Sequence, residues 1–186
     1  MGCSERGQYV QIRTSKINQI ESIENREDKI HAAAIMYVEL GIRIVPIRPN
    51  SKALPSSGVN YQSASRKPEI INRWFGVGGK YRGWNIGIAC GQSDGVAAID
   101  IDNQEEWERF SPDNYDFDGP VQRTPSGGTH MLVKWTKEMR SSTSHLATGI
   151  DTRGGDDSSC KSHIVVWPSE INGIPYEQQE SIKLTI

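Results

Sequence analysis

Residues 96–102, with the sequence VAAIDID, constrain the fold more than any other segment of this chain. Alternate side chains of a β-strand point to opposite faces of a sheet, so a strand here places Asp100 and Asp102 side by side on one face. The same strand directs Ile99 and Ile101 into the core. Two carboxylates held together repel each other unless a cation lies between them, and such oxygen ligands suit Mg²⁺ or Mn²⁺. An exposed strand face that happens to be acidic is the alternative interpretation.

Further helices and strands are expected on both sides of this segment. Apolar residues at i, i+3, i+4 and i+7 predict a helix over 26–40, and Pro68 in a first turn predicts another over 68–75. A third helix is expected at 103–110, and strands are expected at 42–47, 85–89, 129–135, 151–153 and 163–167. We interpret residues 1–25 as a polar N-terminal arm and 26–186 as one compact unit. The pattern predicts a mixed α/β or α+β fold with mostly antiparallel strands in its second half.

The composition is typical of a globular protein from a reducing compartment. Hydrophobic residues make up 35% of the 186 positions, and three cysteines are too few for a disulfide framework. The sequence has no run of about 18 apolar residues that could span a membrane, and its start lacks the apolar segment of a signal peptide. We therefore expect a cytoplasmic protein that does not bind a membrane.

Charge is distributed unevenly along the chain, although the net charge is only −2. Residues 41–91 hold eight basic side chains and one acidic one, whereas residues 93–118 hold nine acidic side chains and one basic one. The small net charge argues against strong non-specific binding of nucleic acid. The basic stretch could nevertheless contact phosphates, and the acidic stretch could hold cations. Two solvated faces of opposite sign would produce the same pattern.

A glycine-containing turn comes directly before the strand expected at 129–135. Its sequence is TPSGGTH, at positions 124–130. The backbone N–H groups of Gly127 and Gly128 could converge on an anion, and Ser126 and His130 add side-chain donors. A hairpin turn with a structural histidine is the other interpretation.

The sequence DTR at 151–153 places a carboxylate and a guanidinium on one face if it forms a strand. An ion pair between Asp151 and Arg153 is the alternative to a role in a functional site. Cys90 lies in an apolar strand and is interpreted as a small core residue. Zinc is not favoured, because the remaining possible ligands lack a CxxC pair and a convincing spacing; these are His145, Cys160 and His163.

In their order along the chain, these motifs resemble the primase-polymerase branch of the archaeo-eukaryotic primase superfamily, which forms the catalytic domain of plasmid and phage replication proteins. The resemblance covers about residues 30–178. Besides the motifs above, its landmarks are Val45-Pro46-Ile47, Asn85-Ile86-Gly87-Ile88 and Pro168-Ser169. The ordered set is specific to this family.

The resemblance implies a two-lobed fold, with an N-terminal α/β lobe, a C-terminal lobe like an RNA-recognition motif, and the active site between them. It implies template-dependent nucleotidyl transfer by a DNA primase, a DNA polymerase or both. Two divalent ions, Mg²⁺ or Mn²⁺, would be held by the catalytic residues Asp100, Asp102 and Asp151. The triphosphate would be bound by the remaining site residues, which are Lys52, Ser126, Gly127, Gly128, His130 and Arg153.

The partners that the resemblance implies are a single-stranded DNA template, a primer, nucleoside triphosphates and a helicase domain or subunit. The source would be a prokaryote, a plasmid or a phage. Three other functions are compatible with parts of the pattern. A glycosyltransferase uses a DxD pair to bind a nucleotide diphosphate, a two-metal nuclease uses clustered carboxylates, and a binding module would use an RNA-recognition-like sheet without catalysis.

Overall fold

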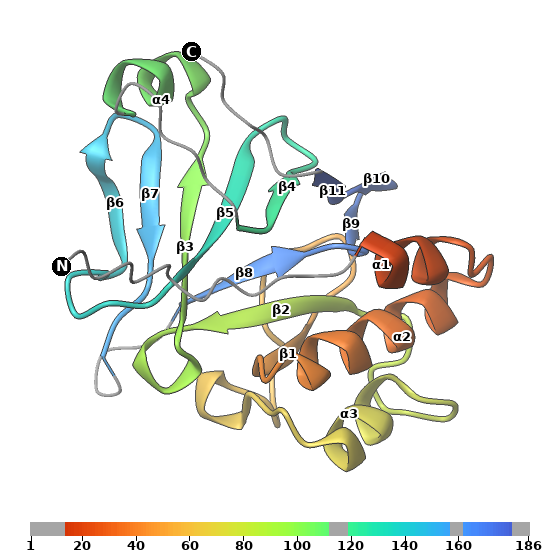
Figure 1. Cartoon of the computed structure of the whole chain (residues 1–186). Helices are drawn as coiled ribbons and strands as arrows, with labels where there is room; N and C mark the ends of the chain where they lie inside the picture. Colours follow the sequence, from red (N-terminus) through yellow and green to blue (C-terminus); the bar gives the residue numbers. More distant parts are fainter. Residues whose placement is uncertain (1–13, 112–118, 157–161, 180–186) are drawn as a thin grey trace, which may run out of the picture.

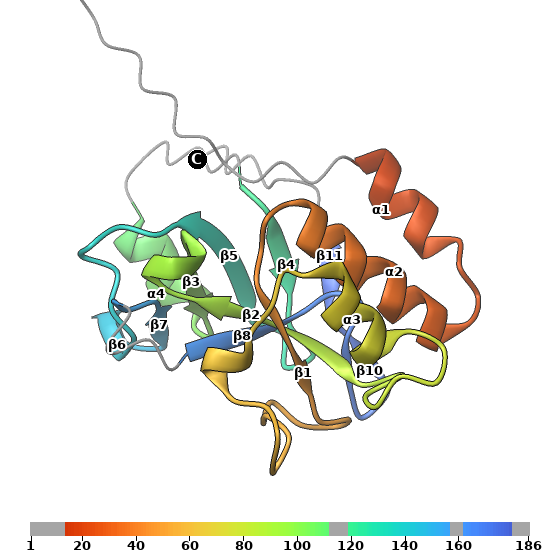
Figure 2. The same ribbon diagram turned by 90° about the horizontal axis from the view of Figure 1, so that it is seen from below.

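The computed structural model describes residues 14–111, 119–156 and 162–179, which form two antiparallel sheets of three and six strands and a separate two-stranded hairpin, with helices packed against the sheets (Figure 1). The smaller sheet has the order β1-β2-β8, and its strands are β1 (Ile44–Ile47), β2 (Asn85–Cys90) and β8 (Ser162–Val166). Helices α2 (Arg26–Glu39) and α3 (Pro68–Phe75) lie beside this sheet in both Figure 1 and Figure 2.

The larger sheet has six strands in the order β11-β4-β5-β3-β7-β6. Its central strands are β5 (Thr129–Lys134), β3 (Val96–Ile101) and β7 (Ile150–Arg153). Its outer strands are β11 (Glu177–Gln179), β4 (Val121–Arg123) and β6 (Ser142–Ala147). The remaining elements are α1 (Thr14–Glu21), α4 (Gln104–Phe110), the 3-10 turns η1 (Tyr61–Ser63) and η2 (Gln92–Asp94), and the hairpin β9 (Glu170–Ile171) and β10 (Ile174–Pro175).

Helix α2 illustrates how local sequence positions these elements. The side chain of Asn25 caps its N-terminus by accepting a hydrogen bond from the backbone N–H of Asp28. The periodic apolar residues that predict the helix, among them Ile30 and Tyr37, are fully buried. Gly41, with φ +80°, follows the C-terminus in the left-handed conformation that ends many helices.

Both faces of the six-stranded sheet are covered, so β3 lies inside the protein. Val96, Ala98 and Leu132 on one face join the large core that is shared with the three-stranded sheet and the N-terminal helices. Ile101 on the other face joins a second core that includes Trp107 of α4. Covering both faces explains why β3 lacks the clean polar-apolar alternation of a half-exposed strand.

The structure corrects the expected surroundings of Ile99 and the expected end of β3. Ile99 is only partly buried and packs at the edge of the second core, and β3 ends at Ile101, one residue before Asp102.

Within the segment interpreted as an arm, residues 14–21 form α1, whose Ile20 is buried in the large core. The indole of Trp167 donates a hydrogen bond to Glu21 at 2.5 Å, so this part of the segment is packed against the domain.

The expected mixed α+β class is confirmed, and the antiparallel strands of the second half are present. Among the described residues, no helix combines the length and the apolar character that crossing a membrane requires.

Candidate active site

The candidate site is centred on a row of four polar side chains that crosses the six-stranded sheet. Gln122 of β4 pairs with His130 of β5, His130 pairs with Asp100 of β3, and Asp100 pairs with Asp151 of β7. Directly opposed residues in antiparallel strands share a face and lie close together, so these side chains are neighbours. The row lies on the face that packs toward β8, because Gln122 donates a hydrogen bond to the carbonyl of Val165.

The carboxylates of Asp100 and Asp151 share one guanidinium group. Nη2 of Arg153 is 3.2 Å from Oδ2 of Asp100 and 2.8 Å from Oδ2 of Asp151. The side chains of Asp100 and Asp151 are only 12% and 13% exposed, so the mutual repulsion of two unpaired charges would be poorly screened. The ion pair between Asp151 and Arg153 that the sequence leaves open is therefore present, and it extends to Asp100.

The surroundings of Asp100 favour its ionised form. Burial alone would raise the pKa of this carboxyl group. The hydrogen bond from His130, followed by the hydrogen bond and charge of Arg153, helps to outweigh burial, so the pKa of Asp100 lies below its ordinary value. Asp100 is thus held as a carboxylate that accepts contacts through both oxygens.

Asp102 directly follows β3 and lies beside the turn that connects β4 with β5. It is exposed, and its backbone N–H donates a hydrogen bond to the carbonyl of Gly149. A Cβ atom on Gly128 would lie 2.9 Å from Oδ1 of Asp102 and 2.8 Å from the carbonyl oxygen of Ile101. The absence of a side chain at Gly128 therefore permits the turn to approach Asp102 closely.

The same turn exposes polar groups next to Asp102. Gly127 adopts φ +90° and donates its N–H to the carbonyl of Thr124. The exposed hydroxyl of Ser126 lies 3.0 Å from that of Thr124. The turn places the hydroxyl of Ser126 and the backbone of Gly127 and Gly128 beside the carboxylate of Asp102. A hairpin turn is one of the two interpretations of this sequence, and the binding of an anion there stays a prediction.

His130 is 4% exposed and is engaged at both ring nitrogens. Nδ1 lies 2.8 Å from the side-chain amide of Gln122, and Nε2 lies 3.2 Å from Oδ1 of Asp100. The ring also packs near that of Tyr176, with 5.8 Å between centroids. The Tyr176 hydroxyl is buried and has no hydrogen-bond partner among the described residues, and burial together with the charge of Asp100 raises its pKa to about 12.

Lys52 and His163 lie at the border of the site. Lys52 belongs to the loop after β1, its side chain is exposed, and its carbonyl accepts a hydrogen bond from Nε2 of His163 at 2.8 Å. Burial lowers the pKa of His163, and the positive charge of Arg153 adds to this effect. Hence His163 lies within electrostatic reach of Arg153, whereas the Lys52 ammonium group projects into solvent.

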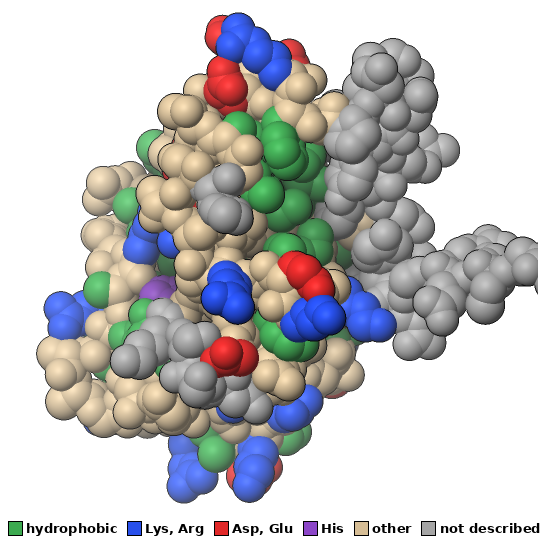
Figure 3. Space-filling view, turned by 90° about the vertical axis from the view of Figure 1, so that its left-hand side faces the viewer, with side chains coloured by type: hydrophobic (Ala, Val, Ile, Leu, Met, Phe, Trp, Pro, Cys, Tyr) green, Lys and Arg blue, Asp and Glu red, His purple; other side chains and the backbone are tan. Residues whose placement is uncertain are grey.

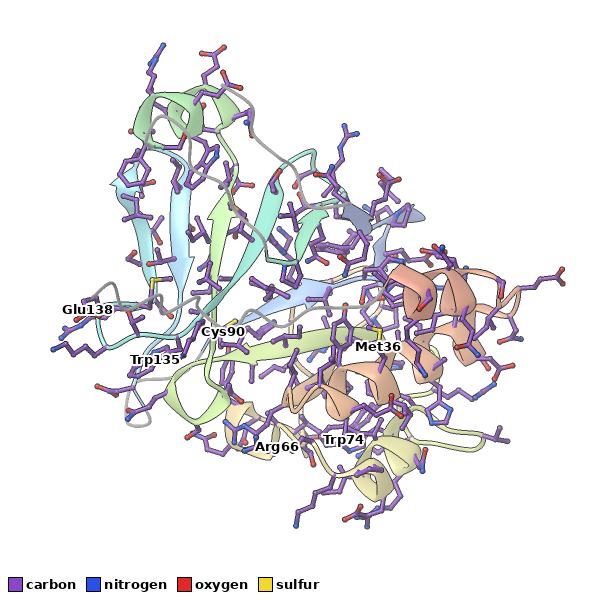
Figure 4. All side chains as sticks on the ribbon, in the orientation of Figure 1. Met36, Arg66, Trp74, Cys90, Trp135 and Glu138 are labelled. Carbon is purple, nitrogen blue, oxygen red and sulfur yellow. The ribbon has the colours of Figure 1, made fainter. Side chains whose placement is uncertain are left out.

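The structure thus brings Asp100, Asp151, Arg153 and His130 into contact and places Asp102 beside the Ser126–Gly128 turn. Sequence reasoning missed Gln122 and Tyr176, because nothing local distinguishes a glutamine or tyrosine that contacts a histidine on another strand. Cys90 is fully buried in the large core, as expected for a core residue, and Figure 4 shows it inside the molecule.

The donor chemistry of the carboxylates fits a hard divalent cation. Asp100 and Asp151 offer adjacent oxygen atoms, which are the ligands that Mg²⁺ and Mn²⁺ prefer. In the described part of the chain, no three or more His, Cys, Asp or Glu side chains are grouped closely enough to hold a metal ion. Arg153 supplies the positive charge between Asp100 and Asp151 in this arrangement.

Charged side chains are distributed unevenly on the face of the protein that Figure 3 shows. Figure 3 shows side chains of both signs at the end where α4 lies, with an apolar patch below them, and a predominance of Lys and Arg over the lower half of the same face. Figure 4 places Arg66 near α3, on the side of the molecule away from α4. Arg66 belongs to the basic stretch of the sequence, residues 41–91.

Comparison with known families identifies the class of protein. The family model described as bifunctional DNA primase/polymerase, N-terminal, matches residues 34–184, which is most of the chain. The chain belongs to this family, and membership implies nucleotidyl transfer by a primase or polymerase. No individual curated protein matches the sequence.

Proposed function

We propose that the protein catalyses template-dependent nucleotidyl transfer from nucleoside triphosphates, acting as a DNA primase, a DNA polymerase or both. The observation that carries this proposal is the row formed by His130, Asp100 and Asp151 on three adjacent strands. It places two carboxylates and a hydrogen-bond donor on one face, near the β4–β5 turn, which carries the exposed hydroxyl of Ser126. Family membership supplies the reaction class.

Asp100, Asp102 and Asp151 are proposed to hold Mg²⁺ or Mn²⁺. Two bound divalent ions would align a 3′-hydroxyl with an α-phosphate and offset the charge that develops in the transition state. The low pKa of Asp100 supports this role, because its carboxylate needs no deprotonation before it serves as a ligand.

The triphosphate is proposed to bind between the β4–β5 turn and the row. Arg153 would exchange one of its carboxylate contacts for a phosphate oxygen, since a guanidinium group binds either anion well. His130 would donate from Nε2, and Ser126 with the backbone of Gly127 and Gly128 would supply further donors. The exposed Lys52 is placed to add a longer-range contact from its loop.

The proposed macromolecular partners are a primer and a single-stranded DNA template in the replication of a prokaryotic, plasmid or phage genome, together with a helicase domain or subunit. The predominance of Lys and Arg on the lower half of the face in Figure 3 supports binding of a phosphate backbone there. Binding of this kind should weaken steeply as salt concentration rises, because it depends on the release of counterions.

The test is extension of a labelled primer on a template, with each nucleotide set and with Mg²⁺ or Mn²⁺. Asp100→Asn and Asp151→Asn should abolish extension, whereas the exposed Glu138→Gln should not change it. Circular dichroism confirms that the variants remain folded. Full extension by both aspartate variants would contradict the proposal.

The same assay separates the competing functions. A nuclease shortens the primer when nucleotides are omitted, and a glycosyltransferase consumes nucleotide sugars without a template. A pure binding module shifts the template in a gel but leaves the primer length unchanged.

A further inference from the structure

Gln122 connects the two sheets with the ring of His130. It is 3% exposed, and its side chain makes three hydrogen bonds. Oε1 accepts from the backbone N–H of Trp167 at 2.9 Å, and Nε2 donates to the carbonyl of Val165 at 2.7 Å. Nε2 also lies 2.8 Å from Nδ1 of His130. Since Val165 lies in β8 and Trp167 follows it, the contacts of Gln122 span both sheets.

The backbone groups of Val165 and Trp167 fix the orientation of the Gln122 side-chain amide. A backbone N–H can only donate and a carbonyl can only accept, so Oε1 must face Trp167 and Nε2 must face Val165. The second hydrogen on Nε2 is then directed at Nδ1 of His130. Nδ1 must therefore present its lone pair, which leaves the ring proton of the neutral imidazole on Nε2.

The proton on Nε2 is directed at the catalytic row. Nε2 lies 3.2 Å from Oδ1 of Asp100, which accepts the hydrogen bond. With Nδ1 occupied by Gln122, the ring has no free lone pair to take a proton from a substrate hydroxyl. On the side of Asp100, His130 can therefore only donate a hydrogen bond from Nε2.

We propose that Gln122 is a positioning residue that holds His130 as the Nε2–H tautomer, so that His130 donates a hydrogen bond to the nucleotide and does not act as a base. The contact between His130 and the nucleotide rests on the proposed nucleotidyl transfer, whereas the assignment of the ring proton does not. On nucleotide binding, the Nε2–H donor is redirected from Asp100 to a phosphate oxygen, and the Gln122 contact keeps the ring in place during this exchange.

The tautomer is measured in the uniformly ¹⁵N-labelled wild-type chain by long-range ¹H–¹⁵N correlation of the imidazole rings, without nucleotide. The chain contains four histidines, and comparison with His130→Gln identifies the signals of His130. At a pH well above the usual pKa of histidine, we expect an unprotonated Nδ1 and a protonated Nε2. A proton on Nδ1 overturns the proposal.

Two substitutions test whether Gln122 is responsible. Gln122→Glu keeps an acceptor for Trp167 but replaces the donor to His130 with a carboxylate, so Nδ1 should gain a proton. Gln122→Met removes all three hydrogen bonds, and the KM for nucleotide should rise roughly tenfold while kcat changes less, the loss expected for one hydrogen bond donated to a charged phosphate group. Unchanged ring signals in Gln122→Glu, or an unchanged KM in folded Gln122→Met, would contradict the role.

Gln178 offers a matched control. It lies directly opposite Gln122 on β11, but its side chain donates to the hydroxyl of Tyr37 at 3.5 Å. Gln178→Met should leave both the His130 ring signals and the KM unchanged, and a change equal to that of Gln122→Met would show a general packing effect instead. Because the tautomer is read without nucleotide, a chain that transfers no nucleotide would contradict the proposed function and leave the assignment of the ring proton standing.

Discussion

Asp100 and Asp151 face each other across the β3–β7 pair with a single guanidinium nitrogen, Nη2 of Arg153, in contact with both. The protein thus carries an internal positive charge at the point where the resemblance to its family places metal ions. Arg153 and a divalent cation are electrostatic alternatives for stabilising the same two carboxylates.

Replacing Arg153 should therefore make the fold more dependent on metal. In metal-free buffer, Arg153→Gln should lower the free energy of unfolding by about 1–2 kcal/mol, since hydrogen bonds to buried charges are lost but Arg153 is partly exposed. Thermal denaturation with and without Mn²⁺ should show a larger gain in Tm for this variant than for the wild type. Arg109→Gln, which removes an ion pair from a 71% exposed side chain, should show neither effect. Equal metal-induced shifts in all three proteins would contradict the idea.

Two adjacent glycines should respond differently to alanine. A Cβ on Gly128 would collide with the backbone of Ile101 and with Asp102, whereas no atom lies within 4 Å of a Cβ on Gly127. Gly128→Ala should therefore displace the turn from Asp102 and lower kcat/KM by roughly tenfold to a hundredfold, the cost typical of misplacing a reacting group. Gly127→Ala should mainly cost about 1 kcal/mol of stability through its positive φ. Steady-state kinetics measure kcat/KM and chemical denaturation measures the stability of both variants. A larger loss of kcat/KM in Gly127→Ala than in Gly128→Ala would refute the prediction.

Ser144 adopts φ +50°, which is unusual for a residue with a side chain, and its backbone N–H donates a hydrogen bond to Oδ1 of Asp151 at 2.8 Å. We expect Ser144→Gly to preserve this contact and to lose only the hydrogen bond that the backbone N–H of Gly149 donates to Oγ of Ser144, which Ser144→Val loses as well. Ser144→Val should cost about 1–2 kcal/mol, because a branched side chain disfavours the left-handed conformation, and it should weaken metal binding by disturbing Asp151. Chemical denaturation and Mn²⁺ titration measure the two effects. Identical behaviour of Ser144→Val and Ser144→Gly would count against this role of the backbone.

The pH dependence of stability should reveal the partly buried His163. Burial and the charge of Arg153 lower the pKa of His163 in the folded protein, against the hydrogen bond to Lys52. In the unfolded chain it titrates near 6.5, so the unfolded state takes up the proton first and the free energy of unfolding falls as pH drops below about 6.5. His163→Gln should lose less stability than the wild type between about pH 8 and pH 5. If the free energy of unfolding falls equally with pH in the wild type and in His163→Gln, His163 does not contribute to the pH dependence.

Local sequence signals were sufficient for the elements with strong patterns. The apolar periodicity of α2 and the runs of apolar residues in β1 and β2 predict elements that the structure contains. Periodic spacing places the apolar side chains on one face of a helix, and short apolar runs bounded by Gly or Pro are typical of buried strands. Strands β6 and β11, with the polar sequences STSHLA and EQQ, have no such signal and exist because neighbouring strands offer hydrogen-bond partners.

The sequence likewise predicts only those parts of the candidate site that lie within one strand or turn. The spacing of Asp100 and Asp102 predicts a shared face, but the residue opposite Asp100 is Asp151 of another strand. That relationship depends on the register between β3 and β7, which no short segment encodes. Gln122 acquires its place through contacts with β8 and β5, so its importance emerges only when both sheets are assembled.

The order of strands along the chain has a consequence for biosynthesis. β1 and β2 precede the first strand of the six-stranded sheet, β8 returns to the three-stranded sheet after β7, and β11 then returns to the six-stranded sheet. A ribosome must therefore release residues beyond 162–166 before β2 gains its second neighbour, and residues 177–179 before β4 gains its outer one. Cutting the chain between β2 and β3 would give two fragments of which neither contains all strands of the three-stranded sheet. We expect such fragments to become structured only on mixing, as partners in complementation, since so many of the contacts link distant parts of the sequence.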